Sequence, residues 1–202
     1  MRSILMLLAL LVVLPVRAES DWRDKLAAAL ADPARPAAER ARDANRLPRE
    51  TLEFFRFDDD LRVLELFPGT GWYTRLLAPV LADEGQLYAA LSTKRLARAQ
   101  PDTPALAAVQ ILDVSAELEA TDRDGIYHLG ALSFWVEDLD LVLTFRNVHN
   151  LDAEGRANLN EAVFEALRPG GLYGVIDHTR RHMEPYRPAN RRRVDPVQVI
   201  QE

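Results

Sequence analysis

The sequence contains no cysteine among its 202 residues. This absence excludes disulfide bonds, a thiol nucleophile and attachment of a lipid to an N-terminal cysteine. An excess of positive charge is missing as well, because 25 lysines and arginines face 31 aspartates and glutamates, for a net charge of −6. General nucleic-acid binders are usually basic, so the composition disfavours nucleic acid as a partner.

A long apolar run is also lacking. Residues Ile4 to Val16 form an apolar segment that is too short to span a bilayer comfortably. Arg2 precedes it and Ala18 closes it, which predicts a secretory signal peptide at residues 1–18; an uncleaved N-terminal anchor is the alternative. Cleavage removes two arginines and brings the net charge to about −8. We therefore expect a periplasmic or secreted protein without stable membrane insertion after cleavage.

Residues 19–57 are predicted to be helical. A first helix is capped by Asp21 and closed by Pro33, a mostly polar helical segment follows over 37–45, and Pro48 suits the first turn of another short helix. The apolar face of the first helix consists of Trp22, Leu26, Ala29 and Leu30. These helices precede the first strand, so we expect them to cover one edge or one end of a sheet.

Residues 58–178 alternate between short apolar strands and helices. The expected strands are 61–67, 86–91, 109–112, 139–145 and 172–176, and the expected helices occupy 72–82, the first half of 93–108, and 152–168. The buried stripe of the last helix should consist of Leu159, Val163, Phe164 and Leu167. Residues 115–130 are polar and remain unassigned. This alternation predicts an α/β fold with a doubly wound, mostly parallel sheet.

Ligands of such sheets bind at the carboxyl ends of the strands. The glycine pair Gly69 and Gly71 follows the first expected strand, where glycine lets the backbone approach a ligand closely. A dinucleotide loop needs a third glycine, but Trp72, Tyr73 and Thr74 follow here. A phosphate loop needs Gly-Lys-Ser/Thr, which is also missing. The loop is therefore of neither type.

Four stretches resemble the class I S-adenosylmethionine-dependent methyltransferases. Glu65 ends a strand just before Pro68-Gly-Thr-Gly71, Gly85 to Ala89 is similar to that family's second strand, Asp113 follows the third, and Leu167 to Leu172 is similar to the turn before its fifth. More narrowly, the chain resembles a group of exported, predicted bacterial methyltransferases, through Asp32 to Pro36, Phe67 to Tyr73 and Val175 to His178.

The resemblance implies a Rossmann-like methyltransferase fold that binds S-adenosylmethionine. The residues implied to contact this cofactor are Glu65, Phe67, Gly69, Gly71, Ser92, Asp113 and Asn147. Two positions depart from the family pattern. Phe67 stands where the family usually has its first glycine, and Leu91-Ser92 replaces the acidic residue that usually holds the ribose hydroxyls. A serine makes fewer and weaker hydrogen bonds than a carboxylate.

Two histidines at strand ends are candidates for catalysis. His149 or His178 could act as a base toward a hydroxyl or amine acceptor, and the alternative for each is a side chain that merely ties a loop to the backbone. We expect no metal, because Arg146-Asn147 stands where an acidic ligand would be expected. Glu65 could instead cap the neighbouring turn, and Trp72 and Tyr73 could line an acceptor pocket or pack in the core.

Residues 179–202 form an arginine-rich tail. Six arginines lie between positions 180 and 193, and Asp195-Pro196 then starts a final helix. An anionic acceptor or a membrane surface could use these arginines, although a solvated arm is the simpler interpretation. The resembled fold usually adds a sixth and a seventh strand after this helix, and we expect both to be missing here.

Two functional hypotheses follow. The first is an S-adenosylmethionine-dependent methyltransferase that acts on a small-molecule acceptor. The second is a non-catalytic binding or structural protein of the cell envelope with a degenerate methyltransferase fold. Phe67, Leu91 and the short C-terminal region motivate the second hypothesis. A cavity open over the two glycines favours the enzyme, whereas Phe67 or Trp72 filling that space favours the binding protein.

Overall fold

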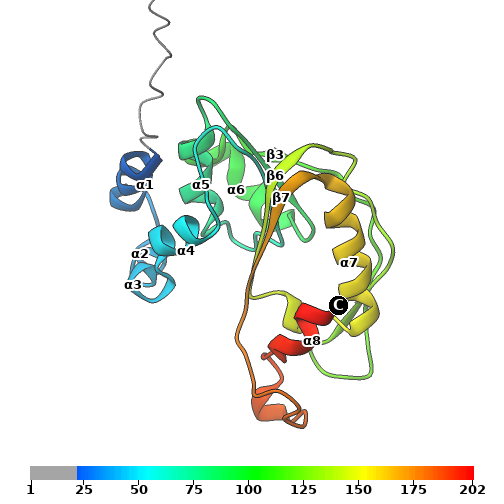
Figure 1. The fold of residues 1–202 in the computed structure, drawn as a ribbon. Coiled ribbons are helices and arrows are strands. Elements are labelled where there is room, and N and C mark those ends of the chain that lie inside the picture. The colour runs from blue at the N-terminus through cyan, green and yellow to red at the C-terminus, as the bar shows by residue number, and fades with distance from the viewer. Residues whose placement is uncertain (1–21) are drawn as a thin grey trace, which may run out of the picture.

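A five-stranded parallel sheet is the centre of the computed structural model, which describes residues 22–202 (Figure 1). Its strand order is β3-β2-β1-β6-β7. The strands are β1 (Arg62–Leu66), β2 (Gln86–Ala90), β3 (Gln110–Ile111), β6 (Leu139–Phe145) and β7 (Leu167–Ile176). The chain order reverses between β1 and β6, so their carboxyl ends flank the crevice in which doubly wound sheets bind ligands. The predicted fold class is confirmed.

The sheet is buried on both faces, as its apolar strands predict. Val63 points into one core with α5 (Thr74–Leu81) and α6 (Lys94–Ala99), whereas Leu64 and Leu66 point into a second core with α7 (Ala153–Ala166). Successive residues of β1 thus pack against helices on opposite faces, because side chains alternate along a strand.

The N-terminal helices lie on the α5 face of the sheet (Figure 1). They are α1 (Trp22–Ala31), α2 (Ala37–Arg40), α3 (Asp43–Arg46) and α4 (Pro48–Phe54). Trp22 and Leu26 are buried against α5, as the predicted apolar face requires, while Leu30 is only partly buried. The predicted signal peptide and the Asp21 cap lie outside the described residues.

Two expectations about α7 and the turn that follows it need correction. Phe164 was expected in the buried stripe of α7, but its side chain is 81% exposed, since the stripe continues through Leu159, Ala162, Val163 and Ala166 instead. The Pro169 to Gly171 turn lies within β7 rather than before it. It forms a bulge there, with a register shift between the pairs of Leu139 and Leu141.

The start of α7 agrees with its prediction. The side chain of Asp152 accepts a 2.7 Å hydrogen bond from the backbone N–H of Gly155, so it caps the helix. Gly155 also allows a close approach, because a Cβ there would lie 2.7 Å from the backbone nitrogen of Leu129. Helix α7 can therefore pack directly against strand β5 (Tyr127–Leu129).

The unassigned polar region contains a small antiparallel sheet. Its strands are β4 (Leu118–Ala120) and β5 (Tyr127–Leu129). Four short 3-10 helices connect other elements, η1 (Gln100–Asp102), η2 (Pro104–Leu106), η3 (Val148–Asn150) and η4 (Pro188–Asn190). The β4-β5 hairpin lies over the carboxyl end of the parallel sheet, where its side chains reach the cavities described below.

The tail folds back rather than extending as a solvated arm. Thr179 pairs with Val194 in an isolated bridge, and the backbone N–H of Arg180 donates to the carbonyl oxygen of Val194 at 2.8 Å. Helix α8 (Pro196–Gln201) then returns beside α7, where Arg156 pairs with Glu202 (Figure 1). Helix α8 starts after Asp195, as predicted, and the side chain of Asp195 caps it by accepting from the N–H of Val197.

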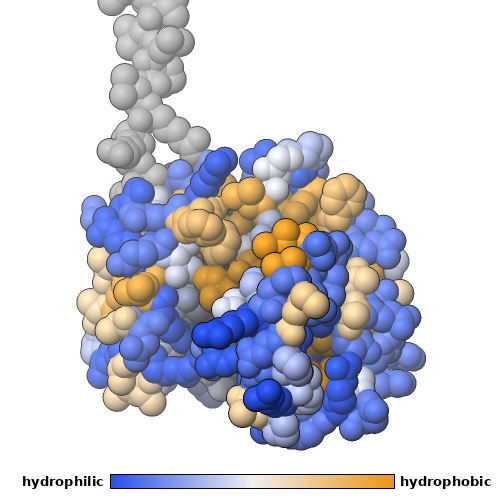
Figure 2. Space-filling view, turned by 60° about the horizontal axis from the view of Figure 1, so that its bottom comes forward, coloured by the Kyte–Doolittle hydropathy of each residue, from blue (hydrophilic) through white to orange (hydrophobic). Residues whose placement is uncertain are grey.

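The surface combines hydrophilic and apolar regions. Figure 2 shows an apolar band that crosses one face between two hydrophilic areas. Large apolar side chains that are at least 78% exposed are Phe54, Trp135, Phe164, Met183 and Ile200. No helix within residues 22–202 is long and apolar enough to cross a membrane. Within the same residues the sheet ends at β7, and no further strand pairs with it.

Candidate functional site

The carboxyl ends of β1, β2 and β6 turn through unusual backbone conformations. Phe67, Leu91, Ser92 and Arg146 follow these strands with φ values of 53°, 64°, 52° and 64°. A non-glycine residue in the left-handed region costs about 1 kcal/mol or more, and such residues cluster at functional sites. The strain therefore marks the same edge of the sheet that the topology selects.

Two neighbouring cavities lie at this edge, with volumes of about 530 and 340 Å³. Phe67, Ser92 and Leu118 line both of them. The larger cavity also contains Asp113, whereas the smaller one contains Gly69, Asn147, Tyr127, Asn150 and Leu151. Five of the seven residues implied by the family resemblance therefore lie around one recess, namely Phe67, Gly69, Ser92, Asp113 and Asn147.

The two glycines of the loop differ in their surroundings. A Cβ added to Gly69 would meet no atom of the described residues within 4 Å, so the space above this glycine is open. A Cβ at Gly71 would lie 2.9 Å from Cδ1 of Leu96, which closes that position. Gly71 instead supports the turn, since its N–H donates to the carbonyl of Pro68 at 2.9 Å. Only Gly69 offers its backbone to a ligand.

Glu65 lies beneath the loop and lines neither cavity. Its carboxylate is buried and accepts a 2.6 Å hydrogen bond from the hydroxyl of Thr74 in the first turn of α5. Burial raises the pKa of Glu65 to about 7, and the Thr74 hydrogen bond only partly offsets this effect. Glu65 therefore links β1 to α5 through a side chain, and no backbone N–H within residues 22–202 donates to its carboxylate.

Trp72 and Tyr73 pack in the core instead of lining a pocket. The indole Nε1 of Trp72 donates to the carbonyl of Glu39 at 2.9 Å, and the ring of Tyr73 stacks on Phe145 with centroids 3.5 Å apart. The guanidinium of Arg46 lies 4.4 Å from the Trp72 ring centroid. Trp72 thus leaves the space over Gly69 free, and the core interpretation of both aromatic residues is confirmed.

His149 is held by Asp177 at the ends of β6 and β7. The ring Nδ1 of His149 lies 2.6 Å from Oδ1 of Asp177, and its backbone N–H donates to Oδ2 at 3.0 Å. Both side chains are almost fully buried. His178 differs, because its side chain is exposed. Desolvation, followed by the positive charge of Arg146, lowers the pKa of His178.

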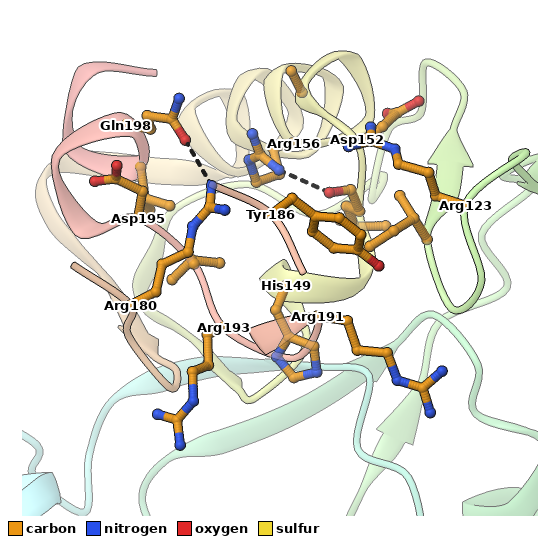
Figure 3. Close-up of a pocket in the computed structure, with 15 residues that line it drawn as sticks. Arg123, His149, Asp152, Arg156, Arg180, Tyr186, Arg191, Arg193, Asp195 and Gln198 are labelled. Carbon is orange, nitrogen blue, oxygen red and sulfur yellow. Dashed lines mark hydrogen bonds between the residues drawn. The ribbon is translucent and has the colours of Figure 1, made fainter. Parts of the chain in front are cut away.

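The ring of His149 lines a third cavity, of about 270 Å³, rather than the recess over Gly69 (Figure 3). Five arginines line this cavity, namely Arg123, Arg156, Arg180, Arg191 and Arg193. Leu151 lines both this cavity and the smaller cavity of the recess. The candidate base and the candidate cofactor residues therefore line different cavities that share Leu151. His178 lines none of these three cavities.

Several residues of the site were missed at the level of sequence. Leu118 and Tyr127 reach the recess from the β4-β5 hairpin, whose polar, short strands carry no periodic signal. The pairing of Asp177 with His149 depends on the register between β6 and β7, so no local sequence pattern indicates it. No group of three or more histidines, aspartates or glutamates suited to a metal ion occurs in residues 22–202.

Comparisons with known proteins support the fold. No protein-family model matches the sequence, and no curated protein matches it significantly. Among solved structures, a SAM dependent methyltransferase from Aquifex aeolicus superimposes with a TM-score of 0.54 at 16% identity, covering 87% of this chain and 82% of that one. The cyclase SpnF superimposes with a TM-score of 0.52 at 19% identity, covering 78% of this chain. The chain spans 55% of the cyclase. The protein therefore has the fold of the class I S-adenosylmethionine-dependent methyltransferases.

Proposed function

We propose that the protein is an S-adenosylmethionine-dependent methyltransferase that acts on a small-molecule acceptor. The observation that carries this proposal is the open space over Gly69 at the carboxyl ends of β1, β2 and β6. The adjoining cavities, of about 530 and 340 Å³, fall in the range of small-molecule sites. The fold likeness supports the same class of cofactor, but a cyclase with this fold shows that the fold does not dictate the reaction.

The residues of the recess suit the different parts of the cofactor. The backbone at Gly69 can approach the methionine portion without an intervening side chain. Asp113, which is exposed in the larger cavity, can accept hydrogen bonds from the adenine. Ser92 offers one hydroxyl to the ribose in place of the usual carboxylate. Phe67 narrows the space, since its ring forms part of the wall of both cavities.

When bound, the cofactor supplies an activated methyl group, so the protein mainly positions the acceptor and excludes water. The base for a hydroxyl or amine acceptor would be His149 rather than the exposed His178. Asp177 occupies Nδ1 of His149, which leaves Nε2 to take a proton. An acceptor that reaches from the arginine-lined cavity past Leu151 to Gly69 would contact both this nitrogen and the methyl group.

Calorimetry tests the binding step directly. We expect S-adenosylhomocysteine to bind the purified protein, and Asp113→Ala to weaken this binding about tenfold through loss of a charge-assisted hydrogen bond. The matched control is Asp102→Ala, at an exposed position away from the recess. If about 1 mM ligand produces no heat of binding, the proposal that the protein binds this cofactor is wrong. The hypothesis of a non-catalytic envelope protein would then remain.

The proposal also includes the cellular location of the protein. A periplasmic or secreted protein follows from the predicted signal peptide at residues 1–18, together with the absence of cysteine. N-terminal sequencing of the protein from a periplasmic extract is expected to begin at Glu19. Recovery of the protein in the cytoplasm with residues 1–18 intact would contradict export.

A further inference from the structure

We propose that the arginine-lined cavity beside His149 binds a small organic anion through a phosphate or carboxylate group. The tail, the loop before β5, the 3-10 helix η3 and helix α7 form its walls, and α8 closes it (Figure 3). The identification of this anion as the methyl acceptor rests on the proposed function, whereas binding of the anion does not.

Three of the five arginines carry charges that no carboxylate of the described residues neutralises. Arg156 pairs with Glu202, with N–O distances of 2.5 and 2.6 Å, and Arg191 pairs with Asp124. The other three have no carboxylate within ion-pair distance in the described part of the chain. These are Arg123, Arg180 and Arg193.

The contacts of these free cations are with neutral groups. Arg193 donates to the carbonyl of Thr179 at 3.1 Å, and Arg180 donates to the side-chain oxygen of Gln198 at 3.4 Å (Figure 3). The Nε of Arg180 is buried and has no hydrogen-bond partner among residues 22–202. A buried donor without a partner is costly, so an anionic oxygen that enters the cavity would satisfy it.

Two carboxylates in the cavity wall already accept hydrogen bonds from backbone N–H groups. Asp152 accepts from the N–H of Gly155 at 2.7 Å and thus caps α7. Asp195 accepts from the N–H groups of Val197 and Met183 at 3.0 and 2.8 Å. These carboxylates also contact His128 and His182. Because they are engaged in this way, they are poorly placed to bind the three free arginines.

The shape of the cavity favours a small anion over a polyanion. Its volume of about 270 Å³ is slightly below the usual range for drug-sized ligands. Part of the cavity wall is apolar and includes Ile126, Tyr186 and Val194. Planar guanidinium groups bind phosphate and carboxylate oxygens in pairs. The ligand class is therefore a small carboxylate or phosphate monoester with a short apolar portion, and the acidic protein as a whole repels extended polyanions.

The test titrates inorganic phosphate and citrate separately into the full chain by calorimetry, without cofactor. We expect at least one of them to bind more tightly than about 1 mM. Arg180→Gln and Arg193→Gln should each weaken this binding about tenfold. Arg192→Gln is the matched control, since it removes the same charge from the same segment but its side chain does not line this cavity. Exposed charges are screened at physiological salt, so this control should bind normally.

Circular dichroism checks that each variant is folded, and Arg180→Lys provides a second variant that retains the charge but loses the planar fork. No binding of either anion, or equal binding by Arg180→Gln, Arg193→Gln and wild type, would overturn the site. Binding to phosphatidylglycerol vesicles that Arg192→Gln abolishes and Arg180→Gln leaves intact would overturn it in favour of a membrane surface. Separate titration with S-adenosylhomocysteine distinguishes failure of this site from failure of the proposed function.

Discussion

Asp177 holds both the ring and the backbone of His149. Its Oδ1 lies 2.6 Å from the ring Nδ1, and its Oδ2 accepts from the backbone N–H at 3.0 Å. A third hydrogen bond comes from the N–H of His178 at 2.7 Å. The side chains of His149 and Asp177 are 5% and 2% exposed, so water is poorly placed to replace these bonds. The end of β7 therefore orients the turn that follows β6.

Replacement of Asp177 by alanine tests this link. Asp177→Ala leaves the buried ring and two backbone N–H groups without their acceptor, so we expect the free energy of unfolding to fall by about 2–4 kcal/mol. Urea denaturation at neutral pH measures the change. The exposed Asp102→Ala should stay within about 0.5 kcal/mol of wild type. Equal effects of the two substitutions would show that the pair contributes nothing to stability.

Glu65 should make stability depend on pH. Its pKa is about 7 in the folded protein against a usual 4.5, so the folded state binds more protons between these values. Stability contributed by the neutral carboxyl is complete below about pH 4.5 and is lost as the pH rises through about 7. The total loss is on the order of 3 kcal/mol.

Glu65→Gln does not titrate, so it should remove this dependence. Its stability relative to wild type is expected to increase from about pH 5 to about pH 8 and then to level off. Thermal unfolding at several pH values measures this difference. Glu161→Gln, at an exposed position of α7, is the matched control. Parallel curves for wild type and Glu65→Gln would contradict the raised pKa.

Phe67→Gly tests whether the aromatic ring limits the recess. Glycine adopts the φ of 53° without strain, and removal of the ring joins the two cavities. We expect S-adenosylhomocysteine to bind about fivefold more tightly by calorimetry. Leu91→Gly is the control, because Leu91 has a similar φ of 64° but lines only the larger cavity. Weaker binding by Phe67→Gly alone would mean that the ring contacts the ligand favourably.

Arg35 should stabilise the N-terminal helices through its planar fork. It is 3% exposed, bonds both oxygens of Asp43 at 2.9 and 2.8 Å, and donates to the carbonyl of Leu30 at 3.0 Å. Lysine cannot reproduce this geometry. Arg35→Lys is therefore expected to cost about 2 kcal/mol, or about 4–8 °C in Tm. Arg40 is exposed and donates to the carbonyl of Pro33, so Arg40→Lys should leave the Tm near wild type.

Much of the fold was predictable from local patterns. Buried parallel strands appear as short apolar runs, so the strand expected over 61–67 is observed at Arg62–Leu66. Signals for helix starts are local as well, which is why the cap at Asp152 and the helix start at Asp195-Pro196 were predicted correctly. The β4-β5 hairpin escaped prediction because its strands are short and mostly exposed, and Phe164 was misplaced because a helical stripe is wider than its buried part.

The candidate site divides in the same way. That Phe67, Gly69, Ser92, Asp113 and Asn147 meet follows from the strand pattern, because the carboxyl ends of parallel strands lie at one edge. That Glu65 and Gly71 do not line the recess, and that His149 lines another cavity, depends on the packing of the folded chain.

The pairing of His149 with Asp177 also belongs to the tertiary structure. The register that places Phe145 opposite Ile176 brings the residues after both strands together, although 28 positions separate them. The folding of the tail is similar, since the bridge between Thr179 and Val194 returns the arginines to the sheet. Local sequence determines which residues form strands and caps, whereas side-chain partners depend on packing between distant segments.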